Sequence, residues 1–511
     1  MRSKLRDAYL TIDPRGLGVG RIVLATVLLL DLARRLPFAT LWYSNEGLLP
    51  NHTVLWRPTV SYVFSLFFTA SRPYEAAVGF ALCGAAYLML LVGYKTRWAQ
   101  VASLLAVLSL HGRVLFIQNS GDVALVELCV WTCFLPLGRR YSLDASRAPV
   151  RREPVVSWAV LAIAAQLAVI YAFNAVQKWG PTWREGTAVH YALYYANVVT
   201  PIGVWVRDWM TLRQSQVLSW STRVIEGLLP VLLLTPVARR PARWLAIALV
   251  IALHVGFGVF MNLGIFVPAM LAFTPFLVPA SDWDRLERLW ATSSLGQTIR
   301  QLAARVQDDL RRRGLLLPGA RAVDEAASEA AVPRRRALAR AREAMVLALM
   351  AIATCGAIFD NAAATHVRPE VQPEATRAIL GYLQMFQIWA MFAPDVPTSD
   401  LTVAVDAVTA DGRHVDPLNE VLSPGHPFQG TSVPPRLGNN GLASAYFFRL
   451  PDNPDYFTAL GEWLLKYPER SGRNADRIVS FRVYAVKQDD PPPGVRSRSP
   501  AQWHLLFQYP N

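Results

Sequence analysis

The sequence predicts an α-helical membrane bundle of about nine spans, followed by a C-terminal extracytoplasmic domain that is β-rich and sandwich-like. Three observations predict this fold class: 53% of the 511 residues are hydrophobic, only 17% are charged, and long apolar stretches recur along the chain. A soluble chain of this length would carry more charge and shorter apolar runs. A lipid bilayer is therefore the first expected partner.

Each predicted span is an apolar run that approaches the roughly 20 residues needed to cross a bilayer core. The run Trp244–Pro279 would be about 54 Å long as one helix, so we expect two spans with a break at Asn262-Leu263-Gly264. The spans are expected at Gly16–Phe38, Tyr74–Gly93, Trp98–Ile117, Val123–Leu137, Val155–Val176, Val224–Val237, the two halves of Trp244–Pro279, and Ala344–Asp360.

Basic residues predict the orientation of these spans. Two further apolar stretches, Thr59–Ala70 and His190–Val206, are ambiguous, and a crossing by either one alone would flip every later basic loop. As interfacial or re-entrant pieces they leave the basic loops on one side, which the positive-inside rule assigns to the cytoplasm. The N-terminus is then cytoplasmic and the C-terminal domain periplasmic, in a bacterial inner membrane. These loops account for the net charge of +14, so we expect no nucleic-acid partner.

The chain divides into five predicted segments. They are the bundle (1–280), an Arg- and Ala-rich cytoplasmic linker (281–343), the ninth span (344–361), an amphipathic segment on the outer surface (362–400) and the β-rich domain (401–511). The linker holds thirteen arginines, and both a solvated loop and an anionic-lipid contact are compatible with it. The amphipathic segment is expected to be helical over Thr376–Phe392. In the last domain we expect strands at Leu401–Val408, Tyr446–Leu450 and Ile478–Val486, and a helix at Tyr456–Lys466.

Polar residues inside the spans are the best functional candidates, since an ionisable group at the bilayer centre costs about 2.5–3.5 kcal/mol. Span 5 ends in Asn174, Gln177 and Lys178, whose helical spacing allows the three side chains to face one site. Lys178 is either an interfacial anchor beside Trp179 or, if desolvated, a general base. Glu226 is expected near the outer end of span 6, within reach of water.

A second polar group lies on spans 3 and 4 and the turn between them. Either a structural network, for example Arg113 with Asp122 or Glu127, or an active cavity accounts for it. Asp31 and Arg35 on span 1 are expected to pair at i, i+4 spacing. The group consists of His111, Arg113, Asn119, Asp122 and Glu127.

The four cysteines all lie in apolar stretches and read as small buried hydrophobic residues. Cys129 and Cys133 share a helix face and leave a redox or metal pair open as the alternative, but we expect no metal. Nucleotide-binding, zinc-protease and serine-hydrolase motifs are not found in the sequence. The absence of these motifs argues against these familiar enzyme classes.

Several short motifs occur in order over about residues 10–290. Together they resemble the HTTM domain, which bacterial membrane proteins share with vitamin K-dependent γ-glutamyl carboxylase. The motifs are Gly16-Leu-Gly-Val-Gly-Arg21, Tyr43-Ser-Asn-Glu-Gly-Leu-Leu-Pro50, Val92-Gly-Tyr-Lys-Thr-Arg97, Asn119-Ser-Gly-Asp122, Phe134-Leu-Pro-Leu-Gly-Arg139 and Lys178-Trp-Gly180 with Trp183-Arg-Glu-Gly186.

The resemblance implies a role for Lys178, which falls on the lysine that deprotonates vitamin K hydroquinone in the carboxylase. It also implies a vitamin K-type quinol as the cofactor. This chain has Ser120, Gly121 and Asp122 where the carboxylase places a catalytic histidine, which puts glutamate carboxylation in doubt. The candidate substrate-binding residues are Asn174, Gln177, Arg113, Asn119, Asp122, His111, Glu127 and Trp183.

Two classes of function remain open. In the first, the bundle is a quinol-dependent oxidase, epoxidase or carboxylase-like enzyme with Lys178 as its base. In the second, the protein is a non-catalytic maturation or export factor whose outer domain binds a client protein, as in the distantly similar layout of lipase maturation factors. A transporter is a third reading, but the sequence lacks the repeat halves and paired half-helices of many transporters.

Overall fold

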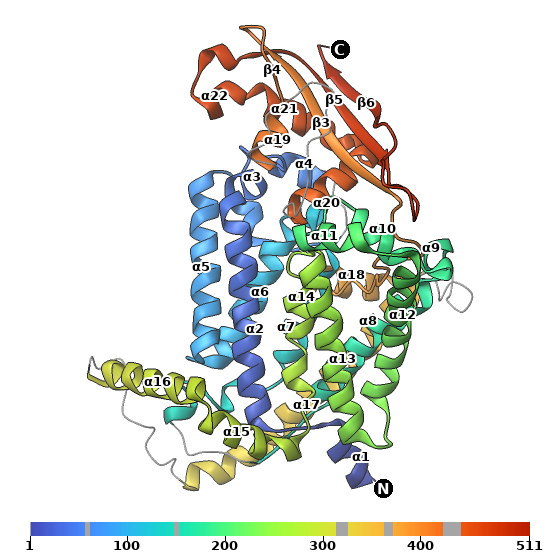
Figure 1. Ribbon diagram of the computed structural model, residues 1–511. Helices are drawn as coiled ribbons and strands as arrows, with labels where there is room; N and C mark the ends of the chain where they lie inside the picture. Colours follow the sequence, from blue (N-terminus) through green and yellow to red (C-terminus); the bar gives the residue numbers. More distant parts are fainter. Residues whose placement is uncertain are drawn as a thin grey trace.

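The computed structural model describes residues 2–56, 62–147, 153–312, 325–361, 371–422 and 441–510. A helical bundle carries a small domain of strands and helices on one end (Figure 1). We call this end of the bundle the upper end and the opposite end the lower end. Parts of the expected segments 1–280, 281–343, 362–400 and 401–511, and of the stretch Thr59–Ala70, lie outside the described residues.

Six helices in the described part of the chain are long and apolar enough to cross a bilayer. Prolines open α2 and α5 in their first turn, where a missing N–H costs nothing, and Gly93 ends α5 in the left-handed conformation. The six match the first, second, fifth, sixth, seventh and ninth expected spans. They are α2 (Pro14–Arg35), which continues into α3 (Ala39–Tyr43), α5 (Pro73–Val92), α8 (Trp158–Gln177), α12 (Leu212–Leu234), α13 (Arg239–Phe260) and α17 (Glu325–Asp360).

Three shorter apolar helices occupy the remaining expected spans: α6 (Thr96–Gly112), α7 (Ser120–Thr132) and α14 (Phe266–Leu271). Every residue of α7 after the first is buried, because this helix runs through the centre of the bundle without a lipid-facing side. The chain breaks between α13 and α14 around Gly264, as expected. Nine crossings remain a prediction, since these three helices are too short to cross by length alone.

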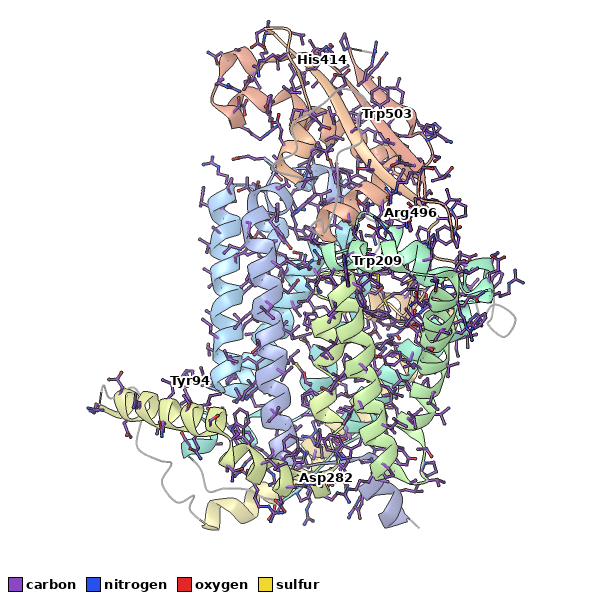
Figure 2. All side chains as sticks on the ribbon, in the orientation of Figure 1. Tyr94, Trp209, Asp282, His414, Arg496 and Trp503 are labelled. Atoms are coloured by element: carbon purple, nitrogen blue, oxygen red, sulfur yellow. The ribbon has the colours of Figure 1, made fainter. Side chains whose placement is uncertain are left out.

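Aromatic residues lie at both ends of the spans: Trp209 is exposed and Tyr94 is half-buried. Trp209 lies at the upper end of the spans, and Tyr94 lies at the lower end (Figure 2). Such aromatic belts are typical of membrane–water interfaces. The short helices α9 (Pro181–Glu185), α10 (Ala188–Tyr194) and α11 (Pro201–Trp209) lie at the upper end, so the stretch His190–Val206 does not cross.

The lower end is closed by short elements and by the linker. Helix α1 (Arg2–Tyr9) leads into β1 (Thr11–Ile12), which pairs with β2 (Val155–Val156). Two helices of the linker, α15 (Trp283–Thr292) and α16 (Ser294–Arg312), lie across this end, roughly perpendicular to the spans (Figure 1).

The upper domain contains one antiparallel sheet of order β4-β3-β5-β6, in which Val405 of β3 faces Val483 of β5. Helices pack against this sheet, whereas we expected a sandwich of two sheets; within the described residues the domain has a single sheet. Its strands are β3 (Ser399–Thr409), β4 (His414–Val415), β5 (Ile478–Asp489) and β6 (Gln502–Tyr509), and its helices are α19 (Pro417–Leu422), α20 (Gly441–Arg449), α21 (Phe457–Leu465) and α22 (Tyr467–Ser471).

The expected strand Tyr446–Leu450 is wrong, because α20 covers most of this stretch. Tyr446, Phe447 and Leu450 are fully buried, at the i, i+1 and i+4 positions of one helical face. Arg449 of the same helix donates hydrogen bonds to the carbonyls of Leu115, Phe116 and Gln118 at the top of the bundle. The residues that we expected to form a strand of the sheet therefore form a helix that docks on the bundle.

The amphipathic segment also differs from expectation. Helix α18 (Glu374–Tyr382) ends ten residues before Phe392. The following residues 384–396, which we call the insert, have no regular secondary structure and enter the bundle instead of lying on its surface. Trp389 in the insert is fully buried. Irregular backbone at membrane depth is tolerated only when protein surrounds it and satisfies its polar groups.

The upper domain docks on the bundle through hydrogen bonds, some of them made by residues that form ion pairs within the domain itself. Arg498 lies 2.7 Å from Asp400 and 2.9 Å from Asp490, and Asp400 accepts a hydrogen bond from the Ala196 N–H of the bundle. His190 of α10 lies 2.8 Å from the Pro491 carbonyl. Burial, together with the charge of Asp400, raises the pKa of Asp490 to about 7.

This raised pKa predicts a pH-dependent stability of the docked domain. A carboxyl group that binds its proton more tightly when folded stabilises the fold at low pH, so stability falls as pH rises from about 4 to about 7. The variant Asp490→Asn should lose this fall of stability with rising pH. The variant Asp452→Asn, at an exposed carboxylate, should keep it. Thermal unfolding of the full chain in nanodiscs at several pH values measures both slopes, and equal slopes would contradict the prediction.

Candidate functional site

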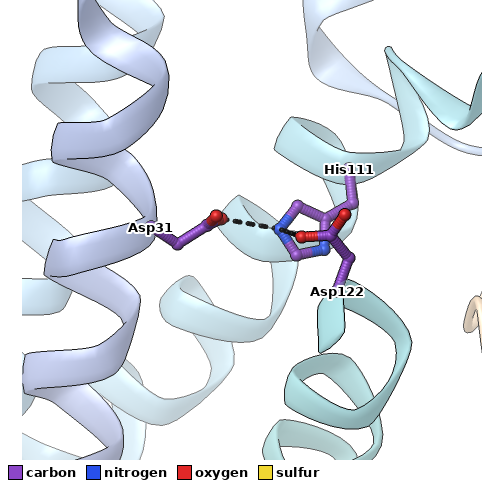
Figure 3. Close-up of side chains that lie close together, drawn as sticks. All are labelled: Asp31, His111 and Asp122. Atoms are coloured by element: carbon purple, nitrogen blue, oxygen red, sulfur yellow. Dashed lines mark hydrogen bonds and ion pairs between the residues drawn. The ribbon is translucent and has the colours of Figure 1, made fainter. Parts of the chain in front are cut away.

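Five ionisable residues from α2, α6 and α7 meet in the upper half of the bundle, and we call them the ion cluster: Asp31, Arg34, Arg35, His111 and Asp122. His111 Nε2 lies 2.8 Å from Asp31 (Figure 3). Arg35 bridges the two carboxylates, at 2.9 Å from Asp31 and 2.6 Å from Asp122, and Arg34 lies 2.7 Å from Asp31. The pairing of Asp31 with Arg35 is confirmed.

The charges of the ion cluster are balanced without a ligand. Three potential metal-binding atoms, from Asp31, His111 and Asp122, lie within 4.8 Å of one another. However, two guanidinium groups already neutralise the two carboxylates, and a divalent cation would add uncompensated charge in a buried place. The arrangement therefore fits a clamp that joins three helices better than it fits a metal site.

Asn119 and Asp122 also build the start of α7. The Asn119 side chain accepts hydrogen bonds from the Gly121 and Asp122 N–H groups, and Asp122 accepts one from the Asn119 N–H at 3.0 Å. This reciprocal capping satisfies donors that a buried helix end would leave open. Arg113 does not pair with Asp122 or Glu127 as considered above, because it donates to the Leu49 carbonyl at 2.6 Å.

The polar residues of α8 hold the insert. Gln177 donates to the Trp389 carbonyl at 2.7 Å, and Asn174 accepts from the Met391 N–H at 3.0 Å. Gln387 of the insert donates to Glu127 and accepts from Gln166. Three expected site residues, Asn174, Gln177 and Glu127, are thus engaged with the chain itself.

Lys178 points elsewhere, because α8 ends at Gln177 and Lys178 leaves the helical path. Its Nζ lies 2.6 Å from both carboxylate oxygens of Glu226 on α12 and 4.8 Å from the centre of the Trp183 ring. The side chains of Lys178 and Glu226 are only 3% and 4% exposed. The expectation that Glu226 is open to water is therefore wrong, and the two residues form a buried acid–base pair.

Gly180 brings the insert close to this pair. A Cβ at Gly180 would lie 1.9 Å from the Asp395 carboxylate, which accepts hydrogen bonds from the Thr182 N–H and hydroxyl. Sequence reasoning missed the contacts of Gly180 and Thr182 with Asp395, although the Lys-Trp-Gly motif marks the place. The acid–base pair and the end of the insert are therefore parts of one structural unit.

The ion cluster predicts a large stability loss for Asp122→Asn. The variant leaves Arg35 with less counter-charge in a buried place, and breaking such a pair costs about 3–5 kcal/mol. The matched control Asp7→Asn removes an exposed partner of Arg6, where about 1 kcal/mol or less is expected. Denaturant unfolding of both variants in detergent compares the two costs, and similar losses would contradict a clamp role.

Comparisons with known proteins now test the resemblance. No curated protein and no solved structure matches the chain significantly. The family model described as the HTTM domain matches residues 9–283, which include the ion cluster, all of α8 and the Lys178–Glu226 pair. The model covers more than half of the chain. The chain is therefore a multi-pass membrane protein that belongs to the HTTM family.

Proposed function

We propose that this protein is a membrane-embedded enzyme in which the Lys178–Glu226 pair removes a proton from a lipid-soluble hydroquinone. The observation that carries the proposal is the buried pair itself, because an amine held 2.6 Å from one carboxylate has a built-in proton acceptor. Structural anchors are normally placed where their charge reaches water. Lys178 is instead enclosed between α8, α12 and Trp183.

The pair can change its protonation state without changing its charge. When Nζ passes its proton to the Glu226 carboxylate, both groups become neutral, and the free amine can accept a proton from a substrate hydroxyl. The net charge of the pair is zero before and after this internal transfer, so little charge is created in the apolar surroundings. Glu226 then acts as the proton store, and Lys178 acts as the base.

The surroundings suit a lipid-soluble partner. Val176 and Trp179, on either side of Lys178 in the sequence, are exposed at 63% and 62%, and α12 presents apolar residues such as Val224 outward. A ligand with a long apolar tail reaches such a surface from the bilayer. A hydroquinone bound beside the pair would supply the electrons for reduction of dioxygen. The buried Trp183 ring, 4.8 Å from Nζ, adds an aromatic wall to these surroundings.

The orientation of the site also belongs to this proposal. Basic residues lie at the lower end, where Arg97 bonds the carbonyls that follow α7, Arg140 pairs with α15 and Arg240 opens α13. By the positive-inside rule, we propose that the lower end faces the cytoplasm and that the upper domain lies in the periplasm, outside a bacterial inner membrane.

A second candidate function is client binding by the upper domain, and the free edge of the sheet favours it. Strand β6 pairs only with β5 among the described residues, and its eight residues contain no lysine, arginine or proline to discourage further pairing. An extended segment of a client protein could add a strand there.

The enzyme proposal predicts that Lys178→Met abolishes quinol turnover. The purified chain in lipid nanodiscs would receive a reduced naphthoquinone and oxygen, with quinol oxidation and epoxide formation followed over time. Loss of a general base lowers rates by about 10²–10⁴-fold. The matched control Lys487→Met removes an exposed lysine of the upper domain and should keep full activity. Wild-type protein that neither binds nor oxidises the quinol would overturn the proposal.

The client-binding candidate predicts site-specific cross-linking in cells. A photoreactive residue in place of Gln508, exposed on β6, should give a discrete adduct with an exported protein. The same probe in place of Val479, exposed on the inner strand β5, should not. Equal adducts from both positions would argue against strand addition at this edge.

A further inference from the structure

Helices α15 and α16 lie across the lower end of the bundle, at the level where the spans end (Figure 1). The position of α15 is set by contacts with the first residues of α2. Arg15 lies 2.6 Å from Asp284 and 3.0 Å from Glu287, and the Trp283 ring packs where a Cβ on Gly16 would lie 3.3 Å from it. These contacts hold α15 against the lower end of α2.

Four apolar residues of the two helices are exposed in the described part of the protein. Leu289 and Trp290 of α15 are 57% and 43% exposed, and Ile299 and Leu302 of α16 are 45% and 59% exposed. Helix α16 projects sideways beyond α5, past the edge of the bundle (Figure 1). A helix with exposed apolar residues that lies across the span ends occupies the place of an interfacial membrane helix.

The charges on α15 and α16 favour lipids with negatively charged headgroups. Both acids within α15 pair with Arg15, which leaves the exposed Arg285 and Arg288 as its outward charges. Helix α16 contains four arginines against two aspartates. A surface with net positive charge and apolar residues is attracted to anionic headgroups.

A cavity lies beside α15 at the same level. It has a volume of about 490 Å³ between the start of α13 and α15, and Asp282 at its wall lies at the lower end (Figure 2). Arg240 pairs with Asp282 but remains 61% exposed, and Arg285 completes the basic side. Trp244, Leu286 and Leu289 form the apolar side. Asp282 neutralises one of the two guanidinium groups, so the cavity keeps one net positive charge beside its apolar wall. This combination suits a phosphate headgroup with its first acyl carbons.

We propose that α15 and α16 lie in the surface of the lower leaflet and that the cavity between α13 and α15 binds the headgroup of an anionic phospholipid. The guanidinium groups of Arg240 and Arg285 contact the phosphate, and the apolar residues of both helices lie among the upper acyl carbons. The proposed lipid site does not depend on chemistry at Lys178. This residue follows the last residue of α8, at the upper end of that helix, whereas the cavity lies at the lower end of the bundle.

The test measures lipid binding to the full chain in detergent by native mass spectrometry, with phosphatidylglycerol and phosphatidylcholine as probes. Phosphatidylglycerol should bind more tightly, and Arg285→Gln should weaken it about fivefold, because one basic residue near an anionic surface contributes about that factor. The matched control Arg482→Gln removes an exposed arginine of the upper domain and should leave binding unchanged. Leu302→Gln, at an exposed position that the fold does not need, should also weaken binding.

Three results would overturn the proposal. One is equal affinity for the two lipids, and another is an equal loss in the Arg285→Gln and Arg482→Gln variants, which would show that only total charge matters. The third is displacement of phosphatidylglycerol by inorganic phosphate at similar concentration, which would make the cavity a phosphate site without a lipid role. Thermal unfolding of each variant separates a lipid effect from a folding defect.

Discussion

The arrangement of this bundle depends on satisfying the backbone of the insert inside the bundle. Unpaired N–H and C=O groups cost several kcal/mol each where no water reaches them, and residues 384–396 form neither helix nor strand. Side-chain amides take the place of a helical ladder: Gln177 bonds the Trp389 carbonyl, Asn361 bonds the carbonyl of Gln387 and the N–H of Trp389, and Gln384 bonds the Leu108 carbonyl. Helices α6, α8 and α17 are therefore held around one irregular segment.

Much of the fold could be predicted because bilayer thickness imposes a local rule on the sequence. Apolar runs located the six long helices, and the break near Gly264 followed from length alone. Alternation likewise located β3, and β5 matches the strand expected at Ile478–Val486. The helix at Tyr446–Leu450 could not be predicted in this way, since a stretch of five residues, four of them apolar or aromatic, fits both periodicities. The choice depends on docking against residues over 300 positions away.

The candidate site was predicted less completely, because its contacts also join residues that are far apart in the sequence. Helical spacing placed Asn174, Gln177 and Lys178 together, yet α8 ends at Gln177, so Lys178 turns away from the other two. Its partner Glu226 comes 48 residues later, and no local pattern links the two. Polar residues in apolar spans were the right signal for burial, but their partners depend on tertiary packing.

The contact between the insert and the loop that follows Lys178 means that the two candidate functions are not physically separate. Residues 384–396 run from α18 to β3 and so connect the bundle with the upper domain. On the way, the Pro394 carbonyl accepts the Gly180 N–H and Asp395 fixes Thr182, two and four residues after Lys178. A Cβ at Gly180 has no room beside Asp395. Any displacement of the upper domain that pulls on the insert must therefore act on the loop that carries Lys178, because packed segments move together rather than stretch.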